Sequence, residues 1–568
     1  MKGPDGKILT ANVEIPSEQL SAGPLGYRVF VVPYDAAQRV LYQPAELGNE
    51  GDCFGSSSDR ELLTSPAFHA QNVYAIVMRL LARFEAALGR RVGWSFGGHQ
   101  LHVAPHAMTE ANAFYSEEMR SLLFGYFVGH DGDNVFTCLS HDIVAHETTH
   151  ALLDGLRTNY TLPSGPDQAA FHEGFADIVA LLSVFGLRET VETILWKERR
   201  AASTDARMID KTLLTEAGLR EGALLGLAEQ FGQEASQFRD DVLRRSVKKP
   251  PPPGALQDPA YEECHVRGEI LAAAVLNAFI AVWRRRLDGW LPKKDASVKV
   301  DRVAEDGADA AEHLLTMAIR ALDYCPVVDI TFGDFFSALL TADRELVPDD
   351  GRYKYRAALR EQFARWHIDP AADDAKEQGR HGEQPEPGCW GSPTEADGLR
   401  YDCVHRESLE RDPDEVFRFL WENRGALGLF PDAYTQVLSV RPCVRVAPDG
   451  FVLRETVSEY MQSVDLEAGN LKSLGVKKPE GMPDDTDVRL TGGGVLVFDG
   501  FGRLKYHVRK RLNNEDRQTK RLDYLWPNRI VDGNGRYGYS DGAPAGMRFA
   551  LVHRRRAGRV ERGGGWDG

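Results

Sequence analysis

Apolar residues recur at helical spacing in three segments of the N-terminal half of the chain. The first begins at Ser65 and Pro66, which suit the N-cap and the first helical position, and it ends before Gly89. The other two cover residues 142–154 and 171–182, where polar residues interrupt an otherwise apolar pattern. We therefore expect three helices, two of which carry buried polar groups.

Alternating apolar and polar positions predict strands elsewhere in the chain. Residues 27–33 form an apolar run within a strand- and loop-rich beginning, and residues 92–103 alternate enough for strands. Two later segments, 444–457 and 495–508, surround the turn sequences Pro-Asp-Gly and Asp-Gly-Phe-Gly. These two segments are predicted to be hairpins.

Composition separates the C-terminal part from the rest. Asp, Glu, Gly and Pro dominate the segment after residue 370, and such a stretch cannot bury enough apolar surface to pack. Beyond it we expect a small α+β or mostly β domain, with a helix at 417–429 and a solvated loop at 509–521. The predicted divisions are an N-terminal α+β lobe (1–157), a helical lobe (158–370), a linker (371–399) and an accessory domain of unknown role (400–568).

The sequence His146-Glu147-Thr-Thr-His150 lies within the second predicted helix. Two histidines four residues apart face the same point on a helix, so both imidazoles can bind one metal ion. Glu147 is placed to reach a water bound to that ion. The alternative is a pair of histidines on a surface helix.

The third predicted helix supplies the groups that would complete such a site. A hydrolytic zinc ion takes three protein ligands and keeps one position open for water. Glu173 is a third ligand, and Asp177 can accept the second ring N–H of a zinc-bound histidine. A solvated acidic helix face is the alternative for this pair.

Over residues 65–368 the chain resembles the thermolysin-like zinc metallopeptidases, or gluzincins. The resemblance is carried by Asp-Ile-Val-Ala-His-Glu-Thr-Thr-His-Ala, from residue 142, and by His-Glu-Gly-Phe-Ala-Asp-Ile, from residue 172. It implies a two-lobed α+β zincin fold and one catalytic zinc ion. The roles it implies are those of the metal ligands His146, His150 and Glu173, the general base Glu147, and the supporting carboxylate Asp177.

Weaker similarities extend to both sides of these motifs. Glu-Ala-Asn-Ala-Phe-Tyr, from residue 110, resembles the family's edge strand, which implies substrate binding by Asn112 and Ala113. His265 corresponds to the family's transition-state histidine, although a capping or packing role is the alternative. Tyr160 is the one tyrosine available for a similar task, one residue out of register. Arg244 corresponds to the family's substrate-binding arginine, at a shorter spacing.

The chain also departs from the family pattern. The position five residues before His265, usually Asp, holds Ala260, so the partner carboxylate of the histidine would be Glu262 or Glu263. Asp142 matches one ligand of the structural calcium of secreted members, but Val184 replaces another carboxylate. A hard cation loses charge and oxygen ligands there. We therefore expect no calcium.

Bulk properties restrict the partners and the compartment. A net charge of −16 argues against general nucleic-acid binding, and no run approaches eighteen apolar residues, so no membrane span is expected. The seven cysteines are scattered, which favours reduced thiols over a disulfide framework. The N-terminus lacks an apolar signal core. We expect a cytoplasmic protein, with non-standard secretion as the alternative.

The sequence therefore predicts a zinc endopeptidase that acts on a peptide or protein substrate, with targeting, substrate choice or a protein partner assigned to residues 400–568. Two alternatives remain open. One is a non-catalytic zinc-containing binding or scaffold protein on a peptidase fold. The other is a gluzincin aminopeptidase, although those enzymes carry Gly-x-Met-Glu-Asn where this chain has Asn-Ala-Phe-Tyr.

Overall fold

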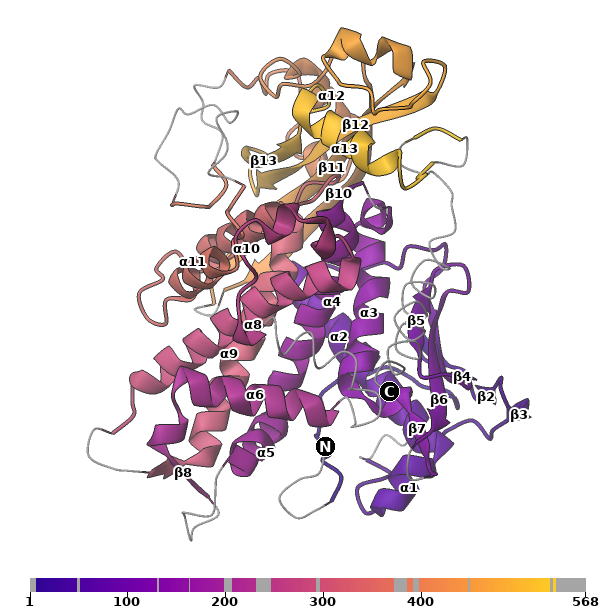
Figure 1. Cartoon of the computed structure of the whole chain (residues 1–568), viewed down its shortest axis with the longest axis vertical. Coiled ribbons are helices and arrows are strands. Elements are labelled where there is room, and N and C mark those ends of the chain that lie inside the picture. The colour runs from indigo at the N-terminus through magenta and orange to yellow at the C-terminus, as the bar shows by residue number, and fades with distance from the viewer. Residues whose placement is uncertain are drawn as a thin grey trace, which may run out of the picture.

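A computed structural model gives the fold as mixed α+β (Figure 1). It describes residues 7–47, 52–129, 132–162, 164–198, 207–230, 247–292, 297–371, 386–391, 398–447, 450–531 and 535–537. The helices are α1 (Asp59–Thr64), α2 (Pro66–Leu88), α3 (His141–Leu156), α4 (Pro166–Phe185), α5 (Arg188–Glu198), α6 (Glu216–Gln230), α8 (Cys264–Asp288), α9 (Val300–Ala321), α10 (Phe332–Leu346), α11 (Tyr355–Arg365), α12 (Pro413–Glu422) and α13 (Glu515–Leu525). The strands are β1 (Val29–Val31), β2 (Tyr34–Asp35), β3 (Val40–Leu41), β4 (Leu101–Met108), β5 (Ala113–Ser116), β6 (Ser121–Val128), β7 (Asn134–Phe136), β8 (Met208–Asp210), β9 (Ser297–Lys299), β10 (Tyr434–Val446), β11 (Val452–Glu467), β12 (Asp487–Asp499) and β13 (Leu504–Lys510).

The N-terminal sheet has the order β1-β4-β6-β5, and β7 also pairs with β6. β1, β4 and β6 are parallel, whereas β5 runs antiparallel to β6 at the edge. Of the predicted strands, the run at 27–33 contains β1. The strand pattern at 92–103 is only partly confirmed, because β4 begins at Leu101.

Helix α2 has the predicted limits. The Ser65 hydroxyl accepts a hydrogen bond from Phe68 N, Pro66 is the first helical residue, and Gly89 ends the helix with φ 68°. That left-handed conformation favours glycine. A Cβ at this position would also lie 2.2 Å from the Val444 carbonyl oxygen, so Gly89 permits close contact with the C-terminal sheet.

The longest helix, α8, is apolar enough to span a membrane by length and composition. Within the described protein, 94% of its most apolar 18-residue segment is buried, because α8 packs against α4, α6, α9 and α11. The same composition suits the central helix of a helical layer. The resemblance to the family implied a helix that begins near His265, but no long apolar run was expected there, because Arg267, Glu269 and Asn277 interrupt the apolar pattern.

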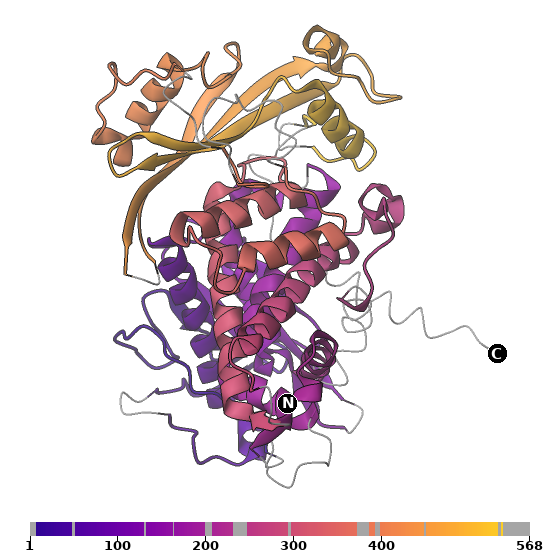
Figure 2. The ribbon, with the colours of Figure 1, turned by 90° about the vertical axis from the view of Figure 1, so that its left-hand side faces the viewer.

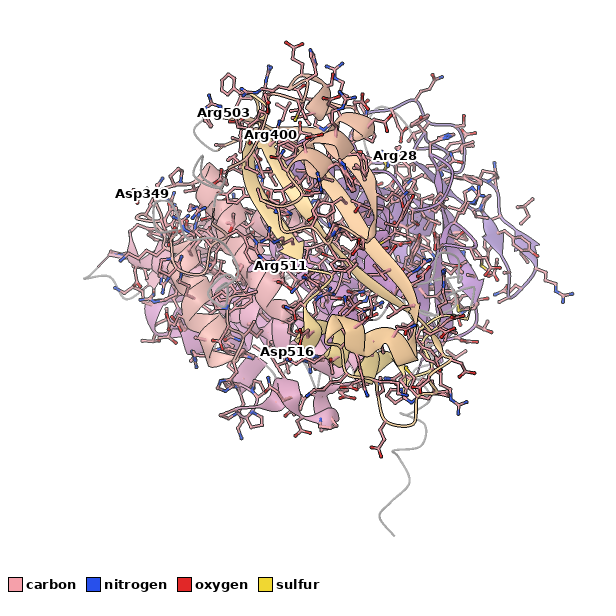
Figure 3. The ribbon with its side chains drawn as sticks, turned by 90° about the horizontal axis from the view of Figure 1, so that it is seen from above. Arg28, Asp349, Arg400, Arg503, Arg511 and Asp516 are labelled. Carbon is pink, nitrogen blue, oxygen red and sulfur yellow. The ribbon has the colours of Figure 1, made fainter. Side chains whose placement is uncertain are left out.

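The C-terminal part is an antiparallel sheet of order β10-β11-β12-β13 with α12 and α13 beside it. Figure 2 shows it arching over the helices. From above, Arg400 and Arg503 lie toward one end of the sheet and Asp516 toward the other (Figure 3). Both predicted hairpins are confirmed, as β10–β11 and β12–β13. The helix predicted at 417–429 is shorter and begins earlier, as α12.

Residues 509–521 are not a solvated loop, which corrects the prediction. They hold the end of β13 and the first part of α13, whose Gln518, Arg521 and Leu522 are buried. Gln518 donates to the carbonyl oxygens of Thr491 and Leu512, at 2.8 Å each. A segment of mixed charge resembles a surface loop in sequence. Here the segment forms a helix, and its polar side chains donate hydrogen bonds to backbone carbonyl oxygens of the C-terminal sheet and the loop after it.

The predicted linker lies partly outside the described residues, but its described part is packed. Cys389 and Trp390 are buried, and the Trp390 indole donates to the Tyr324 carbonyl oxygen at 2.9 Å. The C-terminal sheet continues the same core, because Val457 and Val495 belong to one apolar cluster with the helices. The C-terminal sheet therefore packs directly on the helices, and the division at residue 400 stays a prediction.

Candidate metal centre

Helix α3 places His146 and His150 at the middle of the protein. Almost every side chain of this helix is buried, because α2, α4 and β5 surround it. Thr148 and Thr149 satisfy their hydroxyls on the carbonyl oxygens of residues 144 and 145, within the helix. The two histidines are thereby left as the polar groups of one face, and their Nε2 atoms lie 3.0 Å apart.

Helix α4 brings Glu173 to the same point. Its Oε2 lies 3.4 Å from His146 Nε2, and its Oε1 lies 3.7 Å from His150 Nε2. All three side chains are nearly inaccessible to solvent. Two imidazole nitrogens and a carboxylate, from two different helices, therefore converge.

The second nitrogen of each histidine also has a defined neighbour. His146 Nδ1 lies 2.9 Å from Asp177 Oδ1, in agreement with the position predicted for Asp177. His150 Nδ1 lies 2.7 Å from His172 Nδ1. Burial lowers the pKa of His172 to about 4, so the ring is neutral at pH 7 and one of the two nitrogens donates to the other. His172 was missed in the sequence, although it directly precedes Glu173.

Glu147 faces the edge of the N-terminal sheet. Its carboxylate accepts a hydrogen bond from the backbone N–H of Tyr115 in β5, at 3.0 Å. Ligand atoms of His146, Glu147 and His150 lie within 4.8 Å of one another, so this group could hold a metal ion. Glu147 thus lies between the two imidazoles and β5.

Tyr115 joins β5 to α3 a second time, through its side chain. Its hydroxyl donates to Asp154 at 2.9 Å and lies 2.9 Å from the Ser95 hydroxyl. Burial raises the pKa of Asp154 to about 7. Neither Tyr115 nor Asp154 was assigned a role from the sequence, although Tyr115 ends the segment compared with the family's edge strand and Asp154 lies in the predicted helix 142–154.

The predicted substrate-binding residues Asn112 and Ala113 lie at the start of β5. Ala113 pairs with Phe124 of β6, and β6 is the strand bonded to the inner side of β5. The Asn112 carbonyl oxygen accepts from Gly125 N at 2.9 Å. Its side-chain nitrogen is buried and has no hydrogen-bond partner among the described residues.

A close crossing of α4 and α8 brings His265 to Glu173. A Cβ on Gly174 would lie 2.8 Å from the Gly268 carbonyl oxygen, and a Cβ on Gly268 would lie 2.9 Å from Gly174 N. Glycine at both positions lets the two backbones touch. His265 Nε2 consequently lies 3.4 Å from Glu173 Oε2.

The structure also distinguishes the two candidate partners of His265. Its Nδ1 lies 2.8 Å from the carboxylate of Glu263, the N-cap residue of α8, whose other oxygen accepts from Val266 N at 2.9 Å. Burial alone would raise the pKa of Glu263, but these hydrogen bonds lower it to about 2. Glu263 is therefore the partner carboxylate.

Three further residues from the sequence analysis lie away from this group. The Tyr160 hydroxyl is buried and donates to the Pro326 carbonyl oxygen at 2.5 Å, so it points into the core between α4 and α10 rather than to the histidines. We therefore withdraw its predicted role. Arg244 lies outside the described residues. Val184, at the position compared with a calcium ligand, is a buried residue of α4.

Comparison with known proteins adds nothing to this geometry. No protein-family model matches the chain, and no curated protein is significantly similar to it.

Proposed function

We propose that this protein is a zinc-dependent peptidase, with His146, His150 and Glu173 as the zinc ligands. The observation that carries the proposal is the convergence of two Nε2 atoms and one carboxylate within 3.0–3.7 Å of one another, from two packed helices. Beside this point lie a second carboxylate (Glu147), a histidine of a third helix (His265 of α8) and the edge strand β5. A peptidase needs these parts together.

The donor set suits zinc. Zinc accepts imidazole nitrogen and carboxylate oxygen, and its hydrolytic sites use three protein ligands. Asp177 and His172 contact the outer ring nitrogens, which is the support that metal-bound histidines usually receive. When bound, zinc supplies a Lewis acid that polarises a carbonyl group and acidifies water.

Glu147 is the proposed general base. It takes a proton from the attacking water and passes it to the leaving amine. The hydrogen bond from Tyr115 N fixes one carboxylate oxygen of Glu147. The relative position of α3 and β5 therefore determines where the other oxygen lies. Asp154, which accepts from the Tyr115 hydroxyl, fixes the same pair of elements.

His265 is the proposed donor to the oxyanion that forms on the scissile carbonyl. Glu263 faces Nδ1, so it stabilises a protonated ring and leaves the Nε2–H directed toward Glu173 and the metal ligands. This arrangement favours a catalytic over a merely capping role for His265. Glu263, rather than His265, caps the helix.

Substrate binding is assigned to β5. β5 is the last strand of the N-terminal sheet, and a peptide that aligns with such a strand gains backbone hydrogen bonds, while side-chain pockets determine specificity. Asn112 adds a buried amide nitrogen that has no partner among the described residues and could donate to a substrate carbonyl. We further propose that residues 65–368 adopt the two-lobed thermolysin-like architecture, with α3 between the sheet and the helical part.

The test is metal analysis combined with peptide hydrolysis. Dialysed protein should retain zinc and cleave peptides that are blocked at the N-terminus. Cleavage restricted to peptides with a free amine would assign an aminopeptidase instead. Retained zinc without hydrolysis of either class would favour the binding or scaffold function.

A further inference from the structure

A second buried group of metal-ligating side chains lies outside the candidate metal centre. It consists of His69 in α2, His106 in β4 and Cys138 in the 3₁₀ turn Thr137–Leu139. One ligand atom from each residue lies within 4.8 Å of the others, and all three side chains are buried. The proposed peptidase chemistry uses none of them.

The two imidazoles face each other with defined ring nitrogens. His69 Nδ1 lies 2.8 Å from His106 Nε2. The other nitrogen of His69, Nε2, lies 3.0 Å from the Leu63 carbonyl oxygen, which can only accept. His69 Nε2 therefore carries the proton and Nδ1 presents a lone pair. A metal-bound histidine is usually held by this kind of hydrogen bond to a carbonyl oxygen.

The donor types restrict the metal. A sulfur and two imidazole nitrogens favour zinc or copper(I), whereas magnesium and calcium require oxygen ligands. The rings of Tyr42 and Phe136 lie 5.5 and 5.4 Å from the His106 ring and form apolar walls.

A nearby carboxylate balances the charge of a cation in this group. Asp35 is buried and acts electrostatically on His106. The hydroxyls of Tyr42 and Tyr126 donate to it at 3.2 and 3.1 Å, so it is held beside the group. The positive charge of a bound ion would thus be offset by the Cys138 thiolate and by Asp35.

We propose that His69, His106 and Cys138 hold a structural thiophilic metal ion, zinc or copper(I). On binding, the Cys138 thiol releases its proton to solvent, and the His106 proton moves from Nε2 to Nδ1. The ion fastens the turn before α3 to both α2 and β4. Asn72 of α2 supports the same junction, because its amide donates to the Cys138 carbonyl oxygen at 2.9 Å.

Metal stoichiometry tests this site on the full chain. After loading with zinc and dialysis, the wild type should retain two equivalents, and Cys138→Ala and His146→Ala should retain one each. Anaerobic loading with copper(I) distinguishes the two ions. If copper(I), and not zinc, occupies the second position in a Cys138-dependent manner, the site is a copper site. Cys325→Ala is the matched control, because Cys325 is equally buried and belongs to none of these groups.

A spectroscopic measurement keeps the test valid if Cys138→Ala does not fold. Cobalt(II) bound to a thiolate shows an intense sulfur-to-metal charge-transfer absorption, which nitrogen and oxygen ligands do not produce. Wild-type protein loaded with two cobalt equivalents should show this absorption. The Cys264→Ala variant should retain it, because Cys264 lies beside His265 and not in the group of His69, His106 and Cys138. Absence of this band in the wild type would overturn the proposal. So would an unchanged content of every tested metal in folded Cys138→Ala, whatever the number of equivalents that the wild type retains.

Discussion

Two regions of this protein bury ionisable side chains, and they do so in opposite ways. At the junction with the C-terminal sheet, each buried carboxylate meets arginines directly: Asp323 accepts from Arg90 and Arg445, and Glu455 also accepts from Arg445. At α3 and α4, carboxylates and imidazoles instead converge on one point. Two imidazole nitrogens and one carboxylate meet there, and these are groups that can bind a cation.

The two regions differ in the kinds of group that surround each buried carboxylate. At the junction, acids and bases alternate, and opposite charges compensate each other within the protein. Around His146 and His150, the contacts instead join two imidazole nitrogens and one carboxylate, which come from two packed helices. Imidazole nitrogen and carboxylate oxygen are the ligand types that a zinc ion takes in proteins.

Removal of one junction carboxylate should have the largest effect on stability. Asp323→Ala removes the carboxylate that Arg90 contacts and leaves Arg445 with Glu455 alone, and breaking a buried ion pair typically costs about 3–5 kcal/mol. Asp465→Ala is a matched control, because Asp465 also pairs with two arginines but its side chain is 47% exposed. Its cost should stay below about 1 kcal/mol. Denaturant unfolding of both variants measures the contrast, and equal costs would contradict it.

His265→Ala should lower kcat by about 10²–10³-fold with little change in KM, because an oxyanion donor acts mainly in the transition state. Zinc content should remain that of the wild type. Steady-state kinetics on a blocked peptide measures this split. A selective rise in KM would assign His265 to substrate binding instead.

Asp177→Asn should weaken zinc binding by about 10–100-fold, the usual effect of losing the outer partner of a metal-bound histidine. The amide still fits beside His146 Nδ1 but no longer carries charge. Competition with a chelator of known affinity gives the ratio of dissociation constants. Unchanged affinity would mean that Asp177 contributes only to packing.

Expressed per pH unit, the smallest expected effect is a pH dependence from Asp154. Burial raises its pKa to about 7, so the folded protein binds this proton more tightly than the unfolded chain does. The contribution is present at low pH and is lost as pH rises from about 4 to 7, with a slope of at most about 1.4 kcal/mol per pH unit. Asp154→Asn should remove this slope from unfolding curves measured across that range. A slope that persists in the variant would assign it to other groups.

The candidate site could be predicted from the sequence where its residues are close along the chain. Helical spacing alone brings His146 to His150 and Glu173 to Asp177, because one helical turn separates each pair. The sequence did not decide whether Glu262 or Glu263 is the partner of His265. The choice depends on which residue is the N-cap of α8, and the structure shows that it is Glu263. The predicted role of Tyr160 failed because tertiary packing directs its hydroxyl to the Pro326 carbonyl oxygen.

Long-range packing was the least predictable part. The charged stretch around Arg521 resembles a loop by composition, yet it is a helix that bonds to the sheet carbonyls. The pairing of Gly174 with Gly268 is visible only in three dimensions. His69, His106 and Cys138 are likewise far apart in sequence, so no spacing rule brings them together.

The most direct test of the central claim is a zinc titration of metal-free protein, with wild type and Glu147→Gln compared on a blocked peptide. Both proteins should bind zinc with the same affinity at the His146 site. The wild type should gain activity until that site is filled, and the variant should remain about 10²–10⁴-fold slower, because an amide cannot take the proton. Equal activity of the two proteins, or no hydrolysis by the wild type at any zinc ratio, would contradict the account.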